Sequence, residues 1–185
     1  MIFRETPLPG AFIIEIERYT DERGFFARTW CQQEFESHAL IPRMVQASVS
    51  FNKHKGILRG LHFQKAPSKE AKLVRVTRGA IFDVIVDLRP DSSTFLQNFS
   101  VNLDMENRNA LYIPPGFAHG FQTTANDTEV YYLMSDFYEP KYASGVRWND
   151  PAFGIEWPDD DRIILDRDRE YEDFSMGLVE GFRGY

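Results

Sequence analysis

The side chains best suited to chemistry in this sequence are the imidazole of His62, the ammonium group of Lys72 and the phenol of Tyr132. A divalent metal ion accepts neutral or anionic donors, such as imidazoles and carboxylates. Gln64 and Lys72, which follow His62 along the chain, offer an amide and a cation, and the cation would repel the ion. These residue types therefore favour proton transfer over metal binding.

Two segments around these residues resemble the paired metal-binding motifs of cupin barrels: Gly56-Ile57-Leu58-Arg59-Gly60-Leu61-His62-Phe63-Gln64 and Pro114-Pro115-Gly116-Phe117-Ala118-His119-Gly120. Gln64 occupies the position of the second histidine of the first motif, and Lys72 stands near the position of its glutamate. The second segment keeps the PxGxxH pattern, but no asparagine follows at the expected spacing. The resemblance implies a cupin-like barrel that has lost its metal ligands, so we expect neither a metal nor another cofactor.

Length and composition indicate one globular unit. The chain has 185 residues, of which 43% are hydrophobic and 15% aromatic, enough to bury one substantial core. We therefore expect a single domain spanning residues 1–185. The net charge of −7 and the pI near 5.1 argue against a nucleic-acid polymer as partner, because phosphate backbones are bound by dense basic faces. A small phosphorylated ligand remains compatible, since a few arginines suffice to bind it.

Cysteine content and hydropathy bear on the compartment. Cys31 is the single cysteine, so the chain cannot form an internal disulfide. No apolar run approaches the roughly 20 residues that span a bilayer. The N-terminus lacks the basic and apolar segments of a secretion signal. We expect a cytoplasmic protein with no membrane partner.

Short apolar or β-branched runs alternate with turn residues along most of the chain. They predict strands at residues 11–19, 71–76, 80–88, 99–103, 110–113, 120–123 and 129–135, with a turn at 20–24 and a short helix at 33–38. Within 80–88, Ile81, Asp83 and Ile85 share one face and Val84 and Val86 the other. This pattern is typical of an all-β fold, an antiparallel sandwich or jelly-roll barrel with a few short helices. The charge-dense run 159–169 is typical of a solvated loop.

Seven short motifs occur in a fixed order: Asp21-Glu22-Arg23-Gly24-Phe25-Phe26, Leu58-Arg59-Gly60-Leu61-His62-Phe63-Gln64, Ala71-Lys72-Leu73-Val74, Phe82-Asp83-Val84, Gly116-Phe117-Ala118-His119-Gly120-Phe121, Trp148-Asn149-Asp150-Pro151 and Ile155-Glu156-Trp157-Pro158. Together they resemble the dTDP-4-dehydrorhamnose 3,5-epimerase family, cupin-like enzymes without a metal that act on nucleotide-linked 4-keto-6-deoxyhexoses. The resemblance runs from about Pro9 to Asp173. It implies a homodimer that exchanges N-terminal strands within residues 1–45, with residues 159–185 packed over the barrel.

The resemblance also implies the catalytic residues. His62 would be the general base, and its unperturbed pKa of about 6.5 suits that task. Asp168 would orient the imidazole; it lies in Leu165-Asp166-Arg167-Asp168, where the family has Ser-x-(Lys/Arg)-Asp. Tyr132 would donate a proton from the opposite face. Lys72 is placed to stabilise an enolate oxygen as developing charge appears there.

Nine further residues are candidates for contacts with the substrate. Arg23 and Arg59 would clamp a pyrophosphate, and Tyr138 would stack on the nucleobase. Asp83 is either a structural carboxylate or the partner of an imidazole, and His119 either packs or contacts the sugar. The remaining positions at which the family contacts its ligand are Phe26, Arg28, Gln46 and Ser48.

Three of the recognition positions depart from the family pattern. Arg28 and Ala143 stand where the family commonly has glutamate, and Ser48 stands where asparagine is usual. Arg28 could instead face solvent or pair with a nearby acid. The nucleotide, the sugar and the number of inverted centres therefore stay open, and a 3-epimerase or 3,4-ketoisomerase remains an alternative.

Two other classes of protein are less compatible with these residues. A metal-dependent cupin oxygenase would need the ligands that Gln64 and Lys72 have replaced. A sugar-binding cupin without activity would be expected to have lost at least one of His62, Tyr132 and Asp168, and all three are present.

Overall fold

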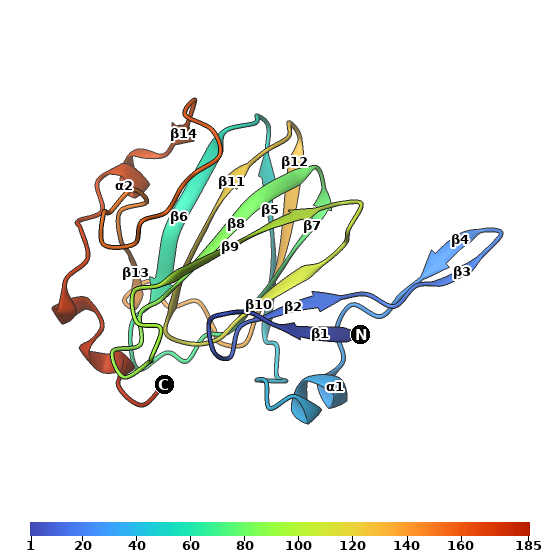
Figure 1. The fold of residues 1–185 in the computed structure, drawn as a ribbon, viewed down its shortest axis with the longest axis horizontal. Helices are drawn as coiled ribbons and strands as arrows, with labels where there is room; N and C mark the ends of the chain where they lie inside the picture. The colour runs from blue at the N-terminus through green and yellow to red at the C-terminus, as the bar shows by residue number, and fades with distance from the viewer.

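The computed structural model describes residues 1–185 as two facing β-sheets with a projecting arm (Figure 1). The first sheet contains, in spatial order, β1 (Ile2–Glu5), β2 (Phe12–Glu15), β10 (Ala110–Ile113), β7 (Lys72–Arg78), β12 (Thr128–Met134) and β5 (Gln46–Asn52). The second contains β13 (Ala143–Gly145), β6 (Ile57–Gln64), β11 (Phe117–Thr123), β8 (Ala80–Asp87) and β9 (Asn98–Asp104), with β14 (Ile163–Ile164) beside β6. This is the all-β, cupin-like architecture predicted from the sequence.

Helical structure is limited to short segments. These are α1 (Gln32–Ser37), α2 (Asp166–Arg169) and two 3-10 turns, η1 (Met176–Leu178) and η2 (Glu180–Phe182). None of the helical segments combines the length and the apolar character that crossing a bilayer requires.

The main core lies between the two sheets and follows the period-two alternation of the strands. Ile81 and Ile85 of β8 point into it and meet Val74 and Val130 from the first sheet. Val86, on the other face of β8, joins a second apolar cluster outside the barrel. Fully burying an aliphatic side chain contributes about 1.5–3 kcal/mol, so this alternation fixes which side chains of β8 can reach the interior.

The C-terminal segment covers the outer face of the second sheet. Val179 and Phe182 are buried against Leu61 and Phe63, which point outward from β6. Before these turns, β14 pairs in parallel with the start of β6, with Ile164 opposite Leu58. Figure 1 shows this segment in orange and red alongside β6. The C-terminal segment thereby places α2 next to the strand that carries His62.

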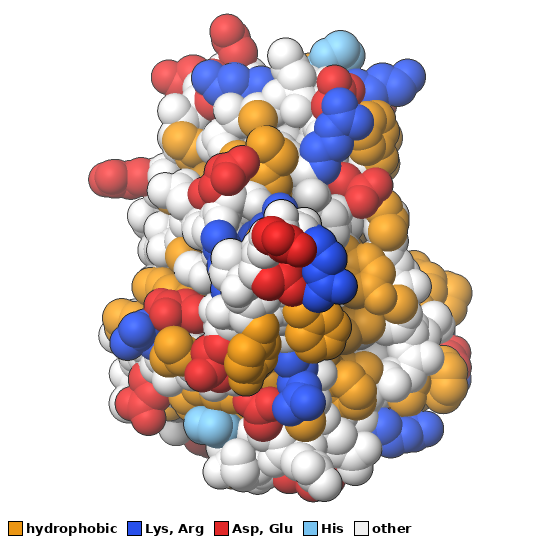
Figure 2. Space-filling view, turned by 90° about the vertical axis from the view of Figure 1, so that its right-hand side faces the viewer, with side chains coloured by type: hydrophobic (Ala, Val, Ile, Leu, Met, Phe, Trp, Pro, Cys, Tyr) orange, Lys and Arg blue, Asp and Glu red, His pale blue; other side chains and the backbone are white.

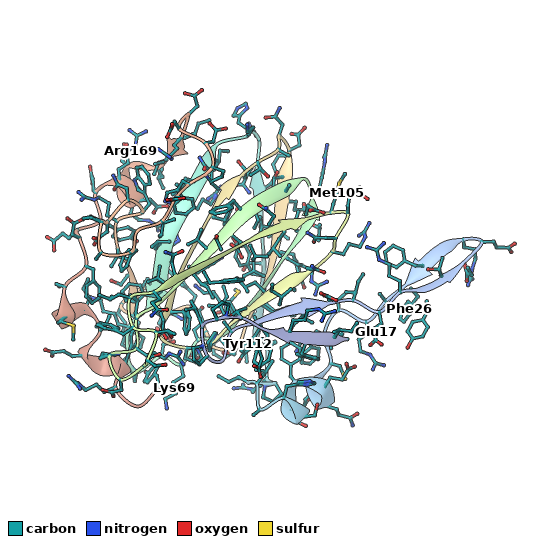
Figure 3. The ribbon with its side chains drawn as sticks, in the orientation of Figure 1. Glu17, Phe26, Lys69, Met105, Tyr112 and Arg169 are labelled. Atoms are coloured by element: carbon teal, nitrogen blue, oxygen red, sulfur yellow. The ribbon has the colours of Figure 1, made fainter.

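The arm consists of β3 (Tyr19–Asp21) and β4 (Gly24–Phe26), which pair only with each other and project from the barrel (Figure 1). The Phe25 ring lies between the guanidinium groups of Arg18 and Arg108, at 4.9 Å and 5.1 Å from its centroid. The neighbouring Phe26 is 74% exposed, and Figure 3 shows it where the arm leaves the barrel, near Glu17. The cation–π contacts of the Phe25 ring thus attach the arm to the barrel, whereas the Phe26 ring stays largely exposed to solvent.

Two expectations from the sequence were wrong in detail. Residues 11–19 do not form one strand, because the chain leaves the first sheet after Glu15 to build the arm. The run 159–169 is not simply a solvated loop, since it contains β14 and α2 and buries Asp168. β14 forms because it pairs with β6, and α2 follows it directly in the chain. The density of charged residues in the sequence does not indicate this pairing.

Two glycines allow β6 and β11 to approach closely beside His62. Gly60 has φ +125°, and a Cβ there would lie 2.5 Å from Gly120 Cα. A Cβ at Gly120 would lie 2.7 Å from the carbonyl oxygen of Arg59 and 2.8 Å from Leu61 Cδ2. His62 and His119 are register partners at this crossing. The glycines therefore set the spacing of the two strands that carry both imidazoles.

Gly120→Ala should lower the free energy of unfolding by about 1–3 kcal/mol, the usual cost of overpacking. Gly177→Ala is the control, because its added Cβ meets no atom within 4 Å and the glycine has an ordinary φ. Urea unfolding of both variants measures the difference. Equal midpoints for the two variants would contradict the close approach of β6 and β11.

Candidate active site

A polar cavity of about 270 Å³ lies between the two sheets. Sheet two contributes Arg59 and His62 from β6 and His119 from β11, and sheet one contributes Lys72 from β7 and Tyr132 from β12. The rest of the lining consists of Ser50, Gly120, Phe121 and Arg167. The structure therefore gathers four of the predicted site residues, in addition to His62, around one space.

His62 is held by a buried carboxylate. Its Nε2 lies 2.8 Å from Asp168 Oδ1, and Asp168 Oδ2 accepts a hydrogen bond from the backbone N–H of Gly60 at 3.0 Å. Asp168 is only 2% exposed. Because an ionised carboxylate can only accept, the proton of the neutral imidazole resides on Nε2. This leaves Nδ1 as the basic nitrogen.

Burial and nearby charges keep the imidazole neutral. Burial lowers the pKa of His62 below its ordinary value of 6.5, and the cations Lys72 and Arg167 lower it further, while Asp168 opposes them. Burial alone would raise the pKa of Asp168, but the hydrogen bonds from His62, Gly60 and Arg167 outweigh it and the pKa is lowered. The pair is thus a neutral imidazole beside a carboxylate, the form that a general base needs.

Tyr132 and Lys72 face the cavity from the sheet opposite His62. β7 and β12 are antiparallel neighbours, with Met134 opposite Lys72 and Tyr132 opposite Val74. Burial raises the pKa of Tyr132, and the carboxylate of Asp83 adds to this effect while Arg59 opposes it. The phenol therefore stays protonated and can act as a donor. Lys72 Nζ lies 3.3 Å from Glu70 Oε2.

A second buried pair lies deeper in the barrel. His119 Nε2 is 2.7 Å from Asp83 Oδ1, on the neighbouring strands β11 and β8. The other carboxylate oxygen of Asp83 is buried without a hydrogen-bond partner. The His119 ring meets the Tyr132 ring edge to face at 6.2 Å. Of the two interpretations for Asp83, this geometry favours the partner of an imidazole.

Arg59 is fixed within the same cavity by an amide. Its Nε donates to Asn52 Oδ1 at 2.8 Å, and Asn52 Nδ2 donates to the carbonyl oxygens of Ser50 and Thr128. Asn52 is 1% exposed, so its orientation is set by these contacts. With Nε occupied, the terminal nitrogens of Arg59 are left for an anionic ligand.

A neighbouring cavity of about 200 Å³ shares His62, Lys72 and Arg167 with the first and is open to solvent beside Tyr138. Its other lining residues are Phe63, Gln64, Glu70, Ala143, Ser144 and Tyr171. Gln46 accepts a hydrogen bond from the backbone N–H of Tyr138. Ser48 lies opposite Tyr132 in the β5–β12 register but lines neither cavity.

The single chain places the predicted contacts Arg23, Phe26 and Arg28 away from both cavities. Arg23 and Phe26 lie on the arm, where Arg23 pairs with Asp21. Arg28 pairs with Glu34 at 3.0 Å, in agreement with the alternative that this residue pairs with a nearby acid. Phe26 and Arg28 line a separate cavity of about 310 Å³ near the N-terminus.

Two side chains that the sequence did not suggest as site residues contact the His62–Asp168 pair. Arg167 Nη2 lies 3.3 Å from His62 Nε2, and its Nε lies 3.3 Å from Asp168 Oδ1. The Tyr171 ring meets the His62 ring edge to face at 6.0 Å. The adjacency of Arg167 to Asp168 was a usable signal, whereas nothing in the sequence pattern pointed to Tyr171.

The donor set around His62 does not suit a metal ion. The polar groups nearest to it include two cations, Lys72 and Arg167, and one carboxylate that is already hydrogen-bonded to the imidazole. No group of three or more His, Cys, Asp or Glu side chains is arranged to hold a metal. The chemistry that these residues can perform is proton transfer next to a stabilised anion.

Comparisons with known proteins agree with this geometry. A family model described as dTDP-4-dehydrorhamnose 3,5-epimerase matches residues 5–176. The protein of that name from Methanothermobacter thermautotrophicus is 47% identical over 173 residues, covering 92% of each chain. The structure of that from Elizabethkingia anophelis has a TM-score of 0.91 at 35% identity, covering 94% of this chain and 96% of the other. The Bacillus anthracis structure, solved with TDP and PPi bound, has a TM-score of 0.90 at 40% identity, covering 94% and 99%.

The lowered pKa of His62 predicts a pH dependence of stability. The unfolded chain protonates this imidazole below a pH of about 6.5, whereas the folded chain resists protonation. Stability should therefore fall as the pH drops through this region. His62→Gln should flatten that fall between about pH 7 and 5. Urea unfolding at several pH values measures it, and identical slopes for wild type and variant would show that the pKa of His62 is not lowered by folding.

Proposed function

The chain belongs to the dTDP-4-dehydrorhamnose 3,5-epimerase family. We propose that His62 removes protons from C3 and C5 of its substrate and that Tyr132 returns protons to these carbons. The substrate proposed is a nucleotide-linked 4-keto-6-deoxyhexose, in the first place dTDP-4-dehydro-6-deoxy-D-glucose. The placement of these two side chains on opposite walls of one cavity is the observation that carries the proposal.

The 4-ketone of such a sugar makes the reaction possible. It acidifies the hydrogens on C3 and C5, because removal of either leaves an enolate with its charge on O4. His62 takes the proton on Nδ1, since Nε2 is bonded to Asp168. The imidazolium that forms lies against the Asp168 carboxylate, which stabilises it.

The enolate needs positive charge and hydrogen-bond donors at O4. Lys72 supplies an ammonium group in the cavity. Donors fixed in advance stabilise developing charge without reorganisation cost. Lys72 is therefore the proposed enolate ligand.

Tyr132 returns the proton from the opposite side. Its raised pKa keeps the phenol protonated until the carbanionic carbon accepts the proton. Removal on one face and return on the other inverts the carbon, and His62 then loses its proton to water while Tyr132 regains one before the second carbon reacts. Inversion at both C3 and C5 gives dTDP-4-dehydro-L-rhamnose, with no change in oxidation state and therefore no need for a redox cofactor.

Recognition of the nucleotide is proposed to involve two copies of the chain. Arg59 and Tyr138 lie at the cavities, whereas Arg23 and Phe26 lie on the arm. Exchange of arms in a homodimer would bring the partner's Arg23 and Phe26 to the site. Figure 2, which faces the side from which the arm projects, shows apolar side chains gathered around its charged tip.

Edge exposure supports the same dimer. β5 ends the first sheet without a neighbour on its outer side, and Val49 and Phe51 on it are 56% and 46% exposed. The indole N–H of Trp30 is also buried without a hydrogen-bond partner in the single chain, and a second copy could supply one. A bare apolar edge strand is a liability that pairing with a second copy removes.

The residues at the recognition positions keep an alternative open. Ala143 lines the outer cavity with a methyl group where the family often has a carboxylate. Loss of that acceptor and of the asparagine at Ser48 would suit a sugar or nucleotide with different hydroxyl contacts. A 3-epimerase or 3,4-ketoisomerase acting on a related nucleotide sugar uses the same base and enolate, and NMR of the product separates these reactions.

His62→Ala should reduce exchange of sugar hydrogens with deuterated water by about 10²–10⁴-fold, the usual effect of losing a general base. Tyr132→Phe should retain much of the exchange while losing inverted product, because the base still acts from its own face. NMR of dTDP-4-dehydro-6-deoxy-D-glucose in deuterated water follows both quantities. Equal loss of exchange and inversion in Tyr132→Phe would contradict the assignment of acid and base to opposite faces.

Co-expression of Arg23→Ala and His62→Ala chains tests the exchanged arm. A mixed dimer contains one site with an intact arm and an intact base, so the mixture should recover about a quarter of wild-type activity. Each variant expressed alone should be weakly active. Light scattering that gives a monomer mass, or no recovery from a verified mixed dimer, would exclude the arm exchange.

A further inference from the structure

The amide of Gln64 bonds the two residues that flank Tyr138. Gln64 ends β6 and is 7% exposed. Its Nε2 donates to the carbonyl oxygen of Phe137 at 3.2 Å, and its Oε1 accepts from the backbone N–H of Glu139 at 2.9 Å. One side chain thus holds the backbone on both sides of Tyr138.

Other side chains extend this attachment. Gln46 Oε1 accepts from the Tyr138 N–H, so three consecutive residues are bonded through two glutamines. Gln64 Nε2 also lies 3.3 Å from Ser68 Oγ, which donates to Asp136 Oδ2 at 2.7 Å. The segment lies between the end of β12 and the start of β13. Side chains of β5 and β6 therefore hold it where no strand pairing does.

The Tyr138 ring depends on this attachment for its position. It is 56% exposed and lines the outer cavity together with His62 and Arg167. A ring with so little packing around it is placed mainly by its backbone. Fixing that backbone before binding reduces the ordering cost that a ligand would otherwise meet.

We propose that Gln64 is a positioning residue that holds Tyr138 ready to stack on a nucleobase. The inference rests on the role proposed above for Tyr138. Gln64 stands where a metal-binding cupin has its second histidine. In this chain that position carries an amide that bonds the backbone on both sides of Tyr138.

Gln122 provides a matched control elsewhere in the barrel. Gln122 is buried, and both ends of its amide bond the backbone of one loop residue, Asp159. Its Nε2 donates to the Asp159 carbonyl at 3.0 Å, and its Oε1 accepts from the Asp159 N–H at 3.1 Å. Methionine approximates the size of glutamine and removes both hydrogen bonds. Gln64→Met and Gln122→Met therefore make the same chemical change at two places.

Calorimetric titration with dTDP should separate the two variants. Gln64→Met should raise the Kd for dTDP by about fivefold, with a similar rise in KM for the nucleotide sugar and little change in kcat. Gln122→Met should bind dTDP like the wild type, although both variants lose thermal stability. Wild-type affinity in Gln64→Met, or equal weakening in both variants, would overturn the inference.

A double variant tests whether Gln64 acts through Tyr138. Tyr138→Ala should weaken dTDP binding by about tenfold or more, the typical value of base stacking on an aromatic ring. In the Tyr138→Ala background, Gln64→Met should not weaken dTDP binding further. An equal loss of dTDP affinity from Gln64→Met in the wild-type and Tyr138→Ala backgrounds would overturn the inference. Unchanged dTDP binding by Tyr138→Ala would instead refute the stacking role itself, and the inference with it.

Discussion

The hydrogen bond between His62 Nε2 and Asp168 Oδ1 is the contact on which the rest of the site depends. It joins residues 106 positions apart in the chain, and the carboxylate is almost fully buried. A buried carboxylate without a partner is costly, so Asp168 is tolerated only because the imidazole and the Gly60 N–H bond it. Holding it there requires β14 on β6 and the apolar turns around Phe182 on the outer face of the sheet. The C-terminal segment thus places the carboxylate that bonds His62.

The facing sheets explain how one cavity can contain a base and an acid on opposite sides. Packed sheets lie about 10 Å apart, a separation that large apolar side chains fill in the core. Around His62 and Tyr132 most of the inward residues are polar, and a cavity of about 270 Å³ remains. The two side chains proposed as proton carriers therefore line the cavity from opposite sheets.

The sequence predicted the parts of this account that local pattern or motif encodes. Period-two alternation identified β8 and its two faces, and motif order identified the family and the catalytic candidates. Alternation did not predict β5, because its apolar residues Val49 and Phe51 are exposed and alternate with serine, glutamine and asparagine. Contacts between distant segments, such as that of Arg167 with His62 or of Gln64 with the Tyr138 segment, depend on tertiary packing and could not be read from spacing. The proposed roles of Arg23 and Phe26 require a second copy of the chain, which no single-chain pattern places.

The protonation state of His62 is the most direct measure of this arrangement. Nitrogen NMR of histidine-labelled protein distinguishes the two neutral tautomers from each other and from the imidazolium, and the loss of one signal in His62→Gln assigns the residue. At neutral pH the account predicts a neutral ring protonated on Nε2, with Nδ1 unprotonated and a pKa below 6.5. A ring protonated on Nδ1, or an imidazolium at neutral pH, would contradict the role of Asp168 and the assignment of His62 as the base.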